Sequence, residues 1–366
     1  MKILHTADWQ IGMKAAHLKG AGSRVREERL RSARRVIKLA NENRVDLVIL
    51  AGDTFEDHSV SPFTVREVIA ILETSDAPVF VLPGNHDYLC SGSVWHYSDW
   101  EKSDKITILK NFQPIVVEGA TLFPCPSTER KSALNPMAWI PLEKSSGFRI
   151  AIAHGSVEGI EMENPDSPIP RDITAQKDLD YVALGHWHSF AKIDTSTGCR
   201  MAYSGTHEQT RFGERDSGNC CLVTLKSKND LPEIVQVKTG GLSWESSIIT
   251  ITAAGELQKS AEFLFETAYP ESTLLRIEFQ GVYPMEEIDI LGRLKALEES
   301  GKFLFCEIRT ERLHVLQTDL SWIEQISEPF LKMTAERIAR GENGIAEQVR
   351  ERALLELYTI FKGSLR

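Results

Sequence analysis

Five short apolar segments in the first half of the chain each end in a glycine or a polar residue. They are KILHTAD, DLVILAGD, APVFVLPGNHD, FRIAIAHG and DYVALGHWH. Apolar runs of this length that stop at such residues are typical of buried strands. We therefore predict five buried β-strands here, and the helical patterns between them indicate a layered α/β domain.

Helical patterns and further strands complete this domain. Within residues 25–44 the apolar side chains recur on one helical face, formed by Leu30, Ala33, Ile37 and Ala40. A second helix is predicted after Ser61 and Pro62, which are a favourable N-cap and first-turn pair. GNCCLVTLK and PEIVQVKT have the composition of further strands. We expect the α/β domain to occupy residues 1–245.

The pattern changes after residue 245. LLRIEFQG alternates apolar and polar residues, and PMEEIDILGRLKALEESG is typical of a helix with Pro284 in its first turn and Gly301 past its end. KFLFCEIR then indicates a strand. These segments predict a compact β-α-β unit at residues 246–316. Residues 317–366 are helical in pattern, with breaks at Pro329 and at GENG.

The composition is that of an ordinary globular protein. Of 366 residues, 42% are hydrophobic and 26% are charged. No apolar run is long enough to span a bilayer, and MKILHTADW turns polar too early for a secretory signal. The six cysteines are scattered without a CxxC spacing, which is typical of reduced thiols. We expect a cytoplasmic protein that does not associate with membranes.

Potential metal ligands stand at the ends of the five predicted strands. The strand ends carry Asp8, Asp53, Asn85 with His86 and Asp87, His154, and His186 with His188. Because ligands bind beyond the carboxyl ends of strands in open α/β sheets, we expect these side chains to converge. Oxygen and imidazole ligands without thiolates suit Mn²⁺, Fe²⁺ or Zn²⁺. A carboxylate such as Asp53 can be shared by two such ions, which together can activate a water for attack on a phosphoester. The ligand set therefore predicts metal-assisted phosphoester hydrolysis.

The same residues carry a family resemblance. D-x-Q, GD, GNHD, a strand-end His-Gly and GHxH, in this order over roughly residues 1–225, resemble the calcineurin-like metallophosphoesterases. HTADWQIG, LAGDTFED, VLPGNHD, ALGHWH and AYSGTHEQTRFGE look like the SbcD-type (Mre-type) DNA repair nucleases within that superfamily. The resemblance implies an α-β-β-α sandwich and cleavage of DNA, as an exonuclease or endonuclease, in double-strand break repair.

The resemblance also implies roles for the later segments and a set of partners. Residues 246–316 correspond to a capping domain, and the helices of residues 317–366 lie where such nucleases bind an SMC-like ATPase of the SbcC type. The alternative for those helices, packing on the chain's own core, stays open. Catalytic subunits of this type commonly pair, so a homodimer is a further expectation.

Carried over residue by residue, the resemblance implies two divalent metal ions, with Mn²⁺ as the expected metal. One ion would be surrounded by Asp8, Gln10, Asp53 and His188. The other would be surrounded by Asp53, Asn85, His154 and His186, with Asp53 as the bridge. His86 would contact the scissile phosphate and protonate the leaving oxygen, and Asp87 would orient His86.

Gln10 departs from the family pattern, which has histidine at this position. An amide carbonyl is neutral and is a weaker donor to a transition metal than imidazole. Gln10 would either bind the metal directly or hold a metal-bound water. In both cases we expect the metal beside Asp8 to bind more weakly than the metal beside His154.

A concentration of basic residues follows directly after Gln10. The net charge of −10 disfavours polyanion binding by the whole surface. A local concentration of basic residues therefore stands out against the acidic remainder of the chain. We predict that this segment contacts DNA phosphates through Lys14, Lys19, Arg24, Arg31, Arg34 and Arg35. The alternative is an ordinary solvated helix face. His207, in SGTHEQ, is either close to the cleft or a polar turn residue.

Two other functions remain open at the level of sequence. The metal ligands alone do not specify the substrate, so a phosphoesterase for small phosphodiesters or phosphoproteins is one alternative. The other is a weakly active or inactive DNA-binding or assembly subunit, for which Gln10 is the direct indication.

Overall fold

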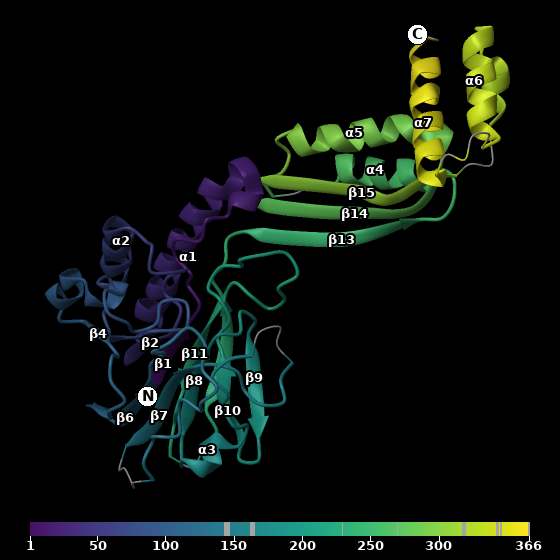
Figure 1. Cartoon of the computed structure of the whole chain (residues 1–366). Coiled ribbons are helices and arrows are strands. Elements are labelled where there is room, and N and C mark those ends of the chain that lie inside the picture. The colour runs from purple at the N-terminus through teal and green to yellow at the C-terminus, as the bar shows by residue number, and fades with distance from the viewer. Residues whose placement is uncertain are drawn as a thin grey trace. The chain divides into compact units, whose positions relative to one another are not determined.

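The computed structural model describes residues 1–142, 147–161, 165–228, 230–268, 270–316, 320–341, 344 and 346–364. The chain divides into two compact units, Met1–Leu242 and Ser243–Arg366, both drawn in Figure 1. All six cysteines are free thiols. Among the described helices, none has the length and apolar character needed to cross a membrane.

The first unit contains a six-stranded sheet with the order β12-β11-β1-β2-β3-β4. Its parallel part consists of β1 (Lys2–Thr6), β2 (Leu47–Ala51), β3 (Val79–Leu82) and β4 (Ile106–Ile108). β11 (Asn219–Thr224) and β12 (Glu233–Lys238) extend it with antiparallel pairing. The strands predicted from the sequence in this sheet are confirmed.

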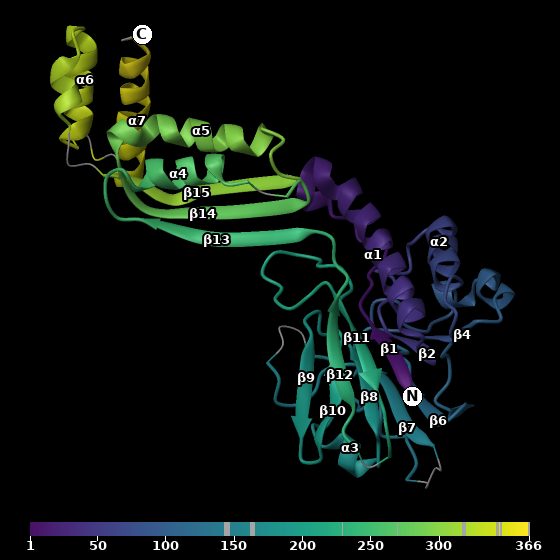
Figure 2. The same ribbon diagram turned by 180° about the vertical axis from the view of Figure 1, so that it is seen from behind.

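A second six-stranded sheet has the order β5-β6-β7-β8-β10-β9, and Figure 2 shows its strands β8, β9 and β10. The parallel strands are β6 (Ala120–Cys125), β7 (Phe148–His154), β8 (Tyr181–Gly185) and β10 (Gly198–Tyr203). β5 (Ile115–Val117) and β9 (Ala191–Thr195) pair antiparallel at the two edges. Both sheets therefore present several parallel strand ends at one edge.

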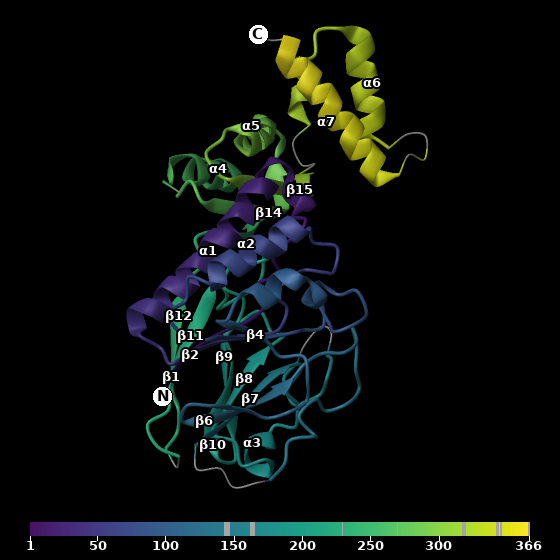
Figure 3. The ribbon, with the colours of Figure 1, turned by 90° about the vertical axis from the view of Figure 1, so that its left-hand side faces the viewer.

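Helices α1 (Gly22–Asn43) and α2 (Pro62–Leu72) cover the outer face of the first sheet, as Figure 3 shows. The α2 helix begins as predicted, because the Ser61 hydroxyl accepts a hydrogen bond from Thr64 N at 3.1 Å. The predicted apolar face of α1 is buried at Ala33, Ile37 and Ala40, whereas Leu30 is only partly buried. Short 3₁₀ turns occur at Ala16–Ala21, Val94–His96 and Ser98–Lys102.

Apolar side chains fill the space between the two sheets. Ile3, Ile49, Ile152 and Ala183 contribute to this layer and are fully buried. The outer face of the second sheet packs against loop residues such as Met137 and against the short helix α3 (Ile173–Gln176). The predicted α-β-β-α sandwich is confirmed, with a fourth layer made mainly of loops.

The second unit is built on a three-stranded parallel sheet with the order β13-β14-β15. Its elements are β13 (Ser243–Ile251), α4 (Glu256–Glu266), β14 (Thr273–Pro284), a 3₁₀ turn (Met285–Glu287), α5 (Ile288–Glu299) and β15 (Phe305–Leu316). α4 and α5 cover one face of the sheet (Figure 1). The sequence predicted only β-α-β here, so β13 and α4 are additions, and Pro284 ends β14 rather than lying in α5.

Helical elements follow the sheet in the second unit. They are a 3₁₀ turn (Ser321–Gln325), α6 (Pro329–Ala339) and α7 (Glu347–Ser364). Trp322 packs against Tyr358 and Phe361, with ring centroids 5.2 and 6.0 Å apart. The predicted helical pattern and its break at Pro329 are confirmed, because Pro329 is the first residue of α6.

Candidate metal centre

The predicted ligands stand at the carboxyl ends of β1, β2, β3, β7 and β8. Backbone hydrogen bonds tie the first two of these loops together, from Asp8 N to Gly52 O (3.0 Å) and from Gln10 N to Asp53 O (2.9 Å). Because the strands are parallel neighbours within each sheet, their ends meet at one edge. This topology brings residues almost 180 positions apart into hydrogen-bond contact, as between His186 N and the Asp8 carboxylate.

Two glycines allow the side chains to approach so closely. A Cβ atom on Gly84 would lie 2.1 Å from Asp53 Oδ1. A Cβ atom on Gly52 would lie 2.1 Å from His154 Nδ1, and the φ of Gly52 is +95°. A larger residue at either position would displace a predicted ligand.

On one side of the site, His154 contacts Ala51, Asn85 and Asp53. Its Nδ1–H donates to Ala51 O at 2.9 Å, which leaves Nε2 facing Asn85 Oδ1 at 2.9 Å and Asp53 Oδ2 at 3.4 Å. Asn85 Oδ1 also lies 3.3 Å from His186 Nδ1. Asp53, Asn85, His154 and His186 thus form one connected group.

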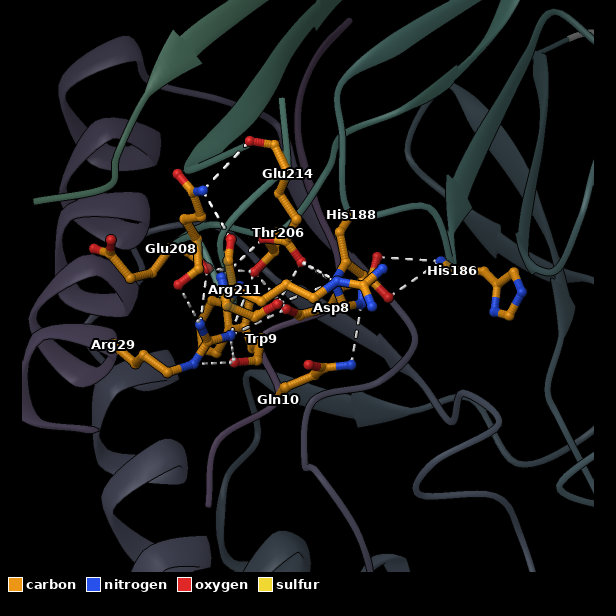
Figure 4. A network of polar contacts seen from close by, with 12 residues as sticks. Asp8, Trp9, Gln10, Arg29, His186, His188, Thr206, Glu208, Arg211 and Glu214 are labelled. Atoms are coloured by element: carbon orange, nitrogen blue, oxygen red, sulfur yellow. Dashed lines mark hydrogen bonds and ion pairs between the residues drawn. The ribbon is translucent and has the colours of Figure 1, made fainter. Parts of the chain in front are cut away.

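Asp8 forms the other side together with Gln10 and His188. Both carboxylate oxygens of Asp8 accept from His186 N, at 3.1 and 3.2 Å. Gln10 Nε2 lies 3.1 Å from His188 Nε2, and His188 Nδ1 lies 2.8 Å from Glu214 Oε1 (Figure 4). With Nδ1–H donated to Glu214, the Nε2 lone pair of a neutral His188 ring faces Gln10.

The backbone at these positions is strained. Asp8, Gln10, Asp53 and His186 have φ values of 53°, 42°, 51° and 102°. Positive φ is uncommon outside glycine and costs of order 1–3 kcal/mol per residue. Such strain clusters at functional sites, and here it falls on four of the predicted ligands.

The chemistry of the donors fits a divalent cation. Asp8, Asp53 and His154 are buried, and each offers a ligand atom within 4.8 Å of the other two. Burial raises the pKa of Asp8 above its usual value, and the charges of His154 and His188 offset only part of that rise. Burial alone lowers the pKa of His154, but the charge and hydrogen bond of Asp53, together with Asp8 and the bond to Ala51, raise that pKa to about 10.

His86 and Asp87 differ from their predicted arrangement. His86 Nδ1 donates to Glu56 O at 2.9 Å, and His86 N donates to Asp53 Oδ1 at 2.9 Å. The Asp87 carboxylate instead accepts from Phe55 N at 2.9 Å and Gly84 N at 2.7 Å. Burial, and then the charge of Asp53, raises the pKa of Asp87 to about 8. As a correction, Glu56 O orients the His86 ring, and Asp87 holds the loop backbone.

Arg29 is part of the site, although no pattern in the sequence singles it out. The side chain is 1% exposed, and it reaches from α1 to the loop after β1 (Figure 4). Its guanidinium donates to Trp9 O (3.1 Å from Nε), to Glu208 O (2.7 Å) and to Thr206 Oγ1 (3.3 Å). Arg29 therefore fixes the backbone beside Asp8. Arg29 O in turn accepts from His207 Nε2 at 2.8 Å, so His207 is a buried structural residue.

The buried Glu208 and the half-exposed Arg35 form a second connection, with Arg35 Nη2 3.7 Å from Glu208 Oε2. Glu208 Oε2 accepts from Ser32 Oγ at 2.5 Å and Gly241 N at 2.7 Å. Arg35 donates to Thr239 O at 2.6 Å and to Glu28 Oε1 at 2.8 Å. The guanidinium of Arg35, which the sequence assigned to DNA, is thus engaged within the chain.

The other predicted DNA-contacting residues differ in exposure. Arg31 pairs with Glu28 at 3.3 Å and Glu27 at 3.7 Å, with 47% of its side chain exposed. Lys14, Arg24 and Arg34 are exposed and form no ion pair with any described residue. The side chain of Lys19 lies outside the described residues.

Two of the proteins that are similar to this chain show the extent of the likeness. The uncharacterized metallophosphoesterase YhaO of Bacillus subtilis is 24% identical over 253 residues, which cover 67% of this chain and 61% of that protein. The SbcD component of the nuclease SbcCD of Staphylococcus epidermidis is 24% identical over 249 residues, which cover 58% of this chain and 63% of that protein. The chain therefore spans about three fifths of the length of these relatives.

Two solved structures show distant likenesses to this chain. TT1561 of Thermus thermophilus aligns with a TM-score of 0.44 and 10% identity, over 65% of this chain and 98% of that chain. The purple acid phosphatase PPD1 of yellow lupin (Lupinus luteus) seeds aligns with a TM-score of 0.40 and 12% identity, over 65% of this chain and 51% of that chain.

The family model for calcineurin-like phosphoesterases matches residues 1–190, which is more than half of the 366 residues. This segment carries β1, β2, β3, β7 and β8 with all of the predicted metal ligands. The protein belongs to the calcineurin-like phosphoesterases, a family of hydrolases that use divalent metal ions.

Proposed function

We propose that the protein is a two-metal phosphodiesterase that cleaves DNA in double-strand break repair, in the cytoplasm. The observation that carries this proposal is the cluster in which the carboxylates of Asp8 and Asp53 lie together with the Asn85 amide and the His154 imidazole. The likeness to a component of the nuclease SbcCD supports DNA as the substrate.

The proposed ligands divide into two overlapping sets. Asp8, Gln10, Asp53 and His188 hold one ion, and Asp53, Asn85, His154 and His186 hold the other. Two bound divalent ions, with Mn²⁺ as the proposed metal, supply an activated water and neutralise charge on the phosphate. Gln10 must present its amide oxygen to act as a ligand, which requires a half-turn of the amide from the orientation that faces His188.

His86 is the proposed proton donor to the leaving oxygen. Because the Glu56 carbonyl can only accept, His86 Nδ1 carries its hydrogen permanently. Nε2 is then the atom that gains and loses a proton, as a general acid requires. The bond to Glu56 also fixes the direction in which Nε2 points.

Activity against two substrates tests this proposal. Purified protein with added Mn²⁺ is incubated either with labelled duplex DNA or with a small aryl phosphodiester. Asp53→Ala should reduce cleavage at least about a thousandfold, because the bridging ligand of both ions is removed. Asp76→Ala is the matched control, since Asp76 is an exposed aspartate in the same unit.

The substrate pattern separates the proposal from its alternatives. Cleavage of DNA that Asp53→Ala abolishes supports the nuclease. Cleavage of the small ester alone would favour a phosphoesterase for other substrates. No cleavage of either would contradict an active enzyme and favour a DNA-binding or assembly subunit.

Exposed basic residues on and near α1 are the proposed contacts to DNA. Lys14, Arg24 and Arg34 carry this proposal more directly than Arg35, whose guanidinium holds Thr239 and Glu28. Reversing the charges of Arg24 and Arg34 should weaken DNA binding and lower its salt dependence by about one unit of slope for each phosphate interaction that is removed. Unchanged binding isotherms at several salt concentrations would contradict this interface.

The C-terminal helices are the proposed site for an SMC-like ATPase. They expose large apolar side chains, with Phe330 68% and Met333 50% exposed on α6 and Ile360 60% exposed on α7. Exposed apolar side chains of this kind favour a protein interface. Phe330→Asp should reduce co-purification with an SMC-like ATPase, and Phe263→Asp on α4, at 62% exposure, is the matched control. Pairing of two copies is also proposed.

A further inference from the structure

A cavity of about 250 Å³ lies in the first unit. Its apolar lining includes Phe112, Leu134, Ala138 and Trp139. The rings of Phe112 and Trp139 meet edge to face, with centroids 6.2 Å apart and planes at 82°. Aromatic walls of this type bind flat rings by stacking and edge contacts.

One wall of the cavity adjoins the candidate metal centre. β6 pairs with β7 so that Cys125 lies opposite Ala153, and the next residue of β7 is His154. The segment after β6 then bonds to the GNHD loop region, through Ser127 N to Pro83 O (3.1 Å) and Leu89 N to Ser127 O (2.8 Å). Ser127 lines the cavity, so the cavity and the metal ligands share this edge of the sheet.

The opposite wall adjoins the loop that follows His154. Ser132 and Ser167 both line the cavity, and Ser167 N donates to Ser132 O at 2.9 Å. The neighbouring residue Asp166 accepts from Ser156 N at 2.8 Å, two positions after His154. Two independent segments therefore connect the cavity to the proposed metal ligands.

The lining selects for a neutral, flat group. Its polar members include Ser127, Thr128, Asn135 and Glu129, and no lysine or arginine lines the cavity among the described residues. A phosphate would meet no positive charge there and would face the Glu129 carboxylate. The volume is below the roughly 300–1,000 Å³ of pockets for drug-sized ligands, so the cavity suits one ring system rather than a whole nucleotide.

We propose that this cavity binds the nucleobase next to the scissile phosphodiester. This inference rests on the proposed phosphodiesterase activity and names a recognition element for it. The phosphate lies at the metal centre while one base enters the cavity, which requires that base to leave the helical stack. Single-stranded or frayed DNA is therefore a better substrate than an internal duplex.

Matched chromogenic esters test the base directly. The 3′- and 5′-p-nitrophenyl phosphates of thymidine are compared with the same esters of 1,2-dideoxyribose, which lack the base. Stacking of one base in the cavity should raise kcat/KM of the better thymidine ester roughly 5- to 150-fold over its abasic partner. Equal values for thymidine and abasic esters would overturn the inference while leaving the phosphodiesterase proposal intact.

Ala138→Leu fills the cavity from an exposed position of its wall. The variant should lose the preference for the base and keep the wild-type kcat/KM for the abasic ester. Ala175→Leu on α3 is the matched control, because Ala175 is exposed in the same unit but does not line the cavity. A base preference that survives Ala138→Leu would contradict the assignment to this cavity.

Binding provides a readout that does not depend on turnover. Equilibrium dialysis with labelled thymidine 5′-monophosphate should show roughly 5- to 150-fold weaker binding to Ala138→Leu than to wild type or Ala175→Leu. If none of the esters is cleaved, the proposed function fails, yet this binding difference still supports a base site. Equal binding to all three proteins would overturn the inference.

An oligonucleotide carrying a single abasic nucleotide identifies the source of the base. If the base belongs to DNA, cleavage of the bond beside the abasic position should become slower. Cleavage of the other bonds in the same single strand should be unchanged. Uniform cleavage, together with a base preference in the small esters, would assign the cavity to free nucleotide esters and overturn the DNA assignment.

Discussion

The first unit buries ionisable side chains around its strand ends, whereas the second unit buries almost none. Asp8, Asp53, Asp87, Glu208 and Arg29 are all between 0% and 2% exposed in the first unit. Among the described residues of the second unit, the buried polar side chains are Thr273 and Glu287. Its ion pair between Arg276 and Glu307 keeps 27% and 30% of the two side chains exposed.

The backbone shows the same contrast. The described non-glycine residues with positive φ all belong to the first unit, and four of them are Asp8, Gln10, Asp53 and His186. In the second unit the positive φ values fall on glycines. Apolar packing therefore stabilises the second unit, while part of the interior of the first unit serves to hold polar groups in a strained, preorganised arrangement.

Replacing the buried, positively charged side chain of Arg29 in the first unit should have the largest effect on stability. Arg29→Met leaves Trp9 O, Glu208 O and Thr206 Oγ1 without their donor, and it should cost about 3–5 kcal/mol of unfolding free energy. Arg276→Met in the second unit should cost at most about 1 kcal/mol, because its ion pair is partly hydrated. Denaturant unfolding monitors both. Similar losses for the two variants would remove the contrast between the units.

Glu214→Gln should have the next largest effect, on metal affinity. Burial alone lowers the pKa of His188, but the hydrogen bond and charge of Glu214, together with the charges of Asp8 and Asp53, raise that pKa above its usual value. The loss of charge should weaken Mn²⁺ binding about 10-fold, up to 100-fold, because a carboxylate that orients a ligating histidine also makes it a better donor. Titration with Mn²⁺ at several pH values measures this.

Glu256→Gln in the second unit is the control for Glu214→Gln. Glu256 accepts from Thr252 N and Ala253 N, so it also holds a backbone, but at a surface helix start. Its substitution should leave Mn²⁺ affinity unchanged. A loss of affinity in both variants would indicate a general structural effect rather than positioning of His188.

His5→Gln should have the smallest effect, visible only as a change in pH dependence. Burial lowers the pKa of His5 from 6.5 to about 3, and the ring bridges Tyr181 OH and Leu184 O. The unfolded chain takes up a proton below pH 6.5 that the folded chain refuses, so stability is complete above pH 6.5 and falls as the pH drops toward 3.

When the pH falls from 7.5 to 5.5, the buried His5 ring lowers the unfolding free energy of the wild type by about 1.4 kcal/mol. The unfolding free energy of His5→Gln should therefore fall by about 1.4 kcal/mol less than that of wild type over this range. His314→Gln, at an exposed position of the second unit, should follow the wild-type curve. Parallel curves for wild type and His5→Gln would show that His5 is not buried as a neutral ring.

Much of the fold follows from local pattern. The five strands with their terminal ligands, the face of α1 and the cap of α2 were predictable because each depends on residues close together in sequence. β13 and α4 were not selected, since SWESSIITI is largely exposed and lacks the continuous apolar run of a buried strand. Strand register and sheet order are set by contacts between distant segments, which periodicity does not encode.

The candidate site also combines features that follow from local sequence with features that depend on contacts between distant segments. The sequence identified Asp8, Asp53, Asn85, His154, His186 and His188, because each follows a strand that ends at the same edge. It assigned the orientation of His86 to its neighbour Asp87, whereas the structure gives that bond to Glu56 O. It also assigned Arg35 to DNA binding and did not single out Arg29. Their partners lie about 180 and 200 residues away, so only tertiary structure could separate them.

The sequence by itself determined which chemical groups are present, the strands that carry them and the edge at which they meet. The tertiary structure decided which atoms face each other: the contact of Gln10 with His188, the support of His188 by Glu214 and the cavity lined by Ser127, Trp139 and Ser167. The physical reason is that hydrophobic periodicity places a residue inside or outside an element. Burial of a polar atom instead demands a specific partner, and that partner can come from any part of the chain.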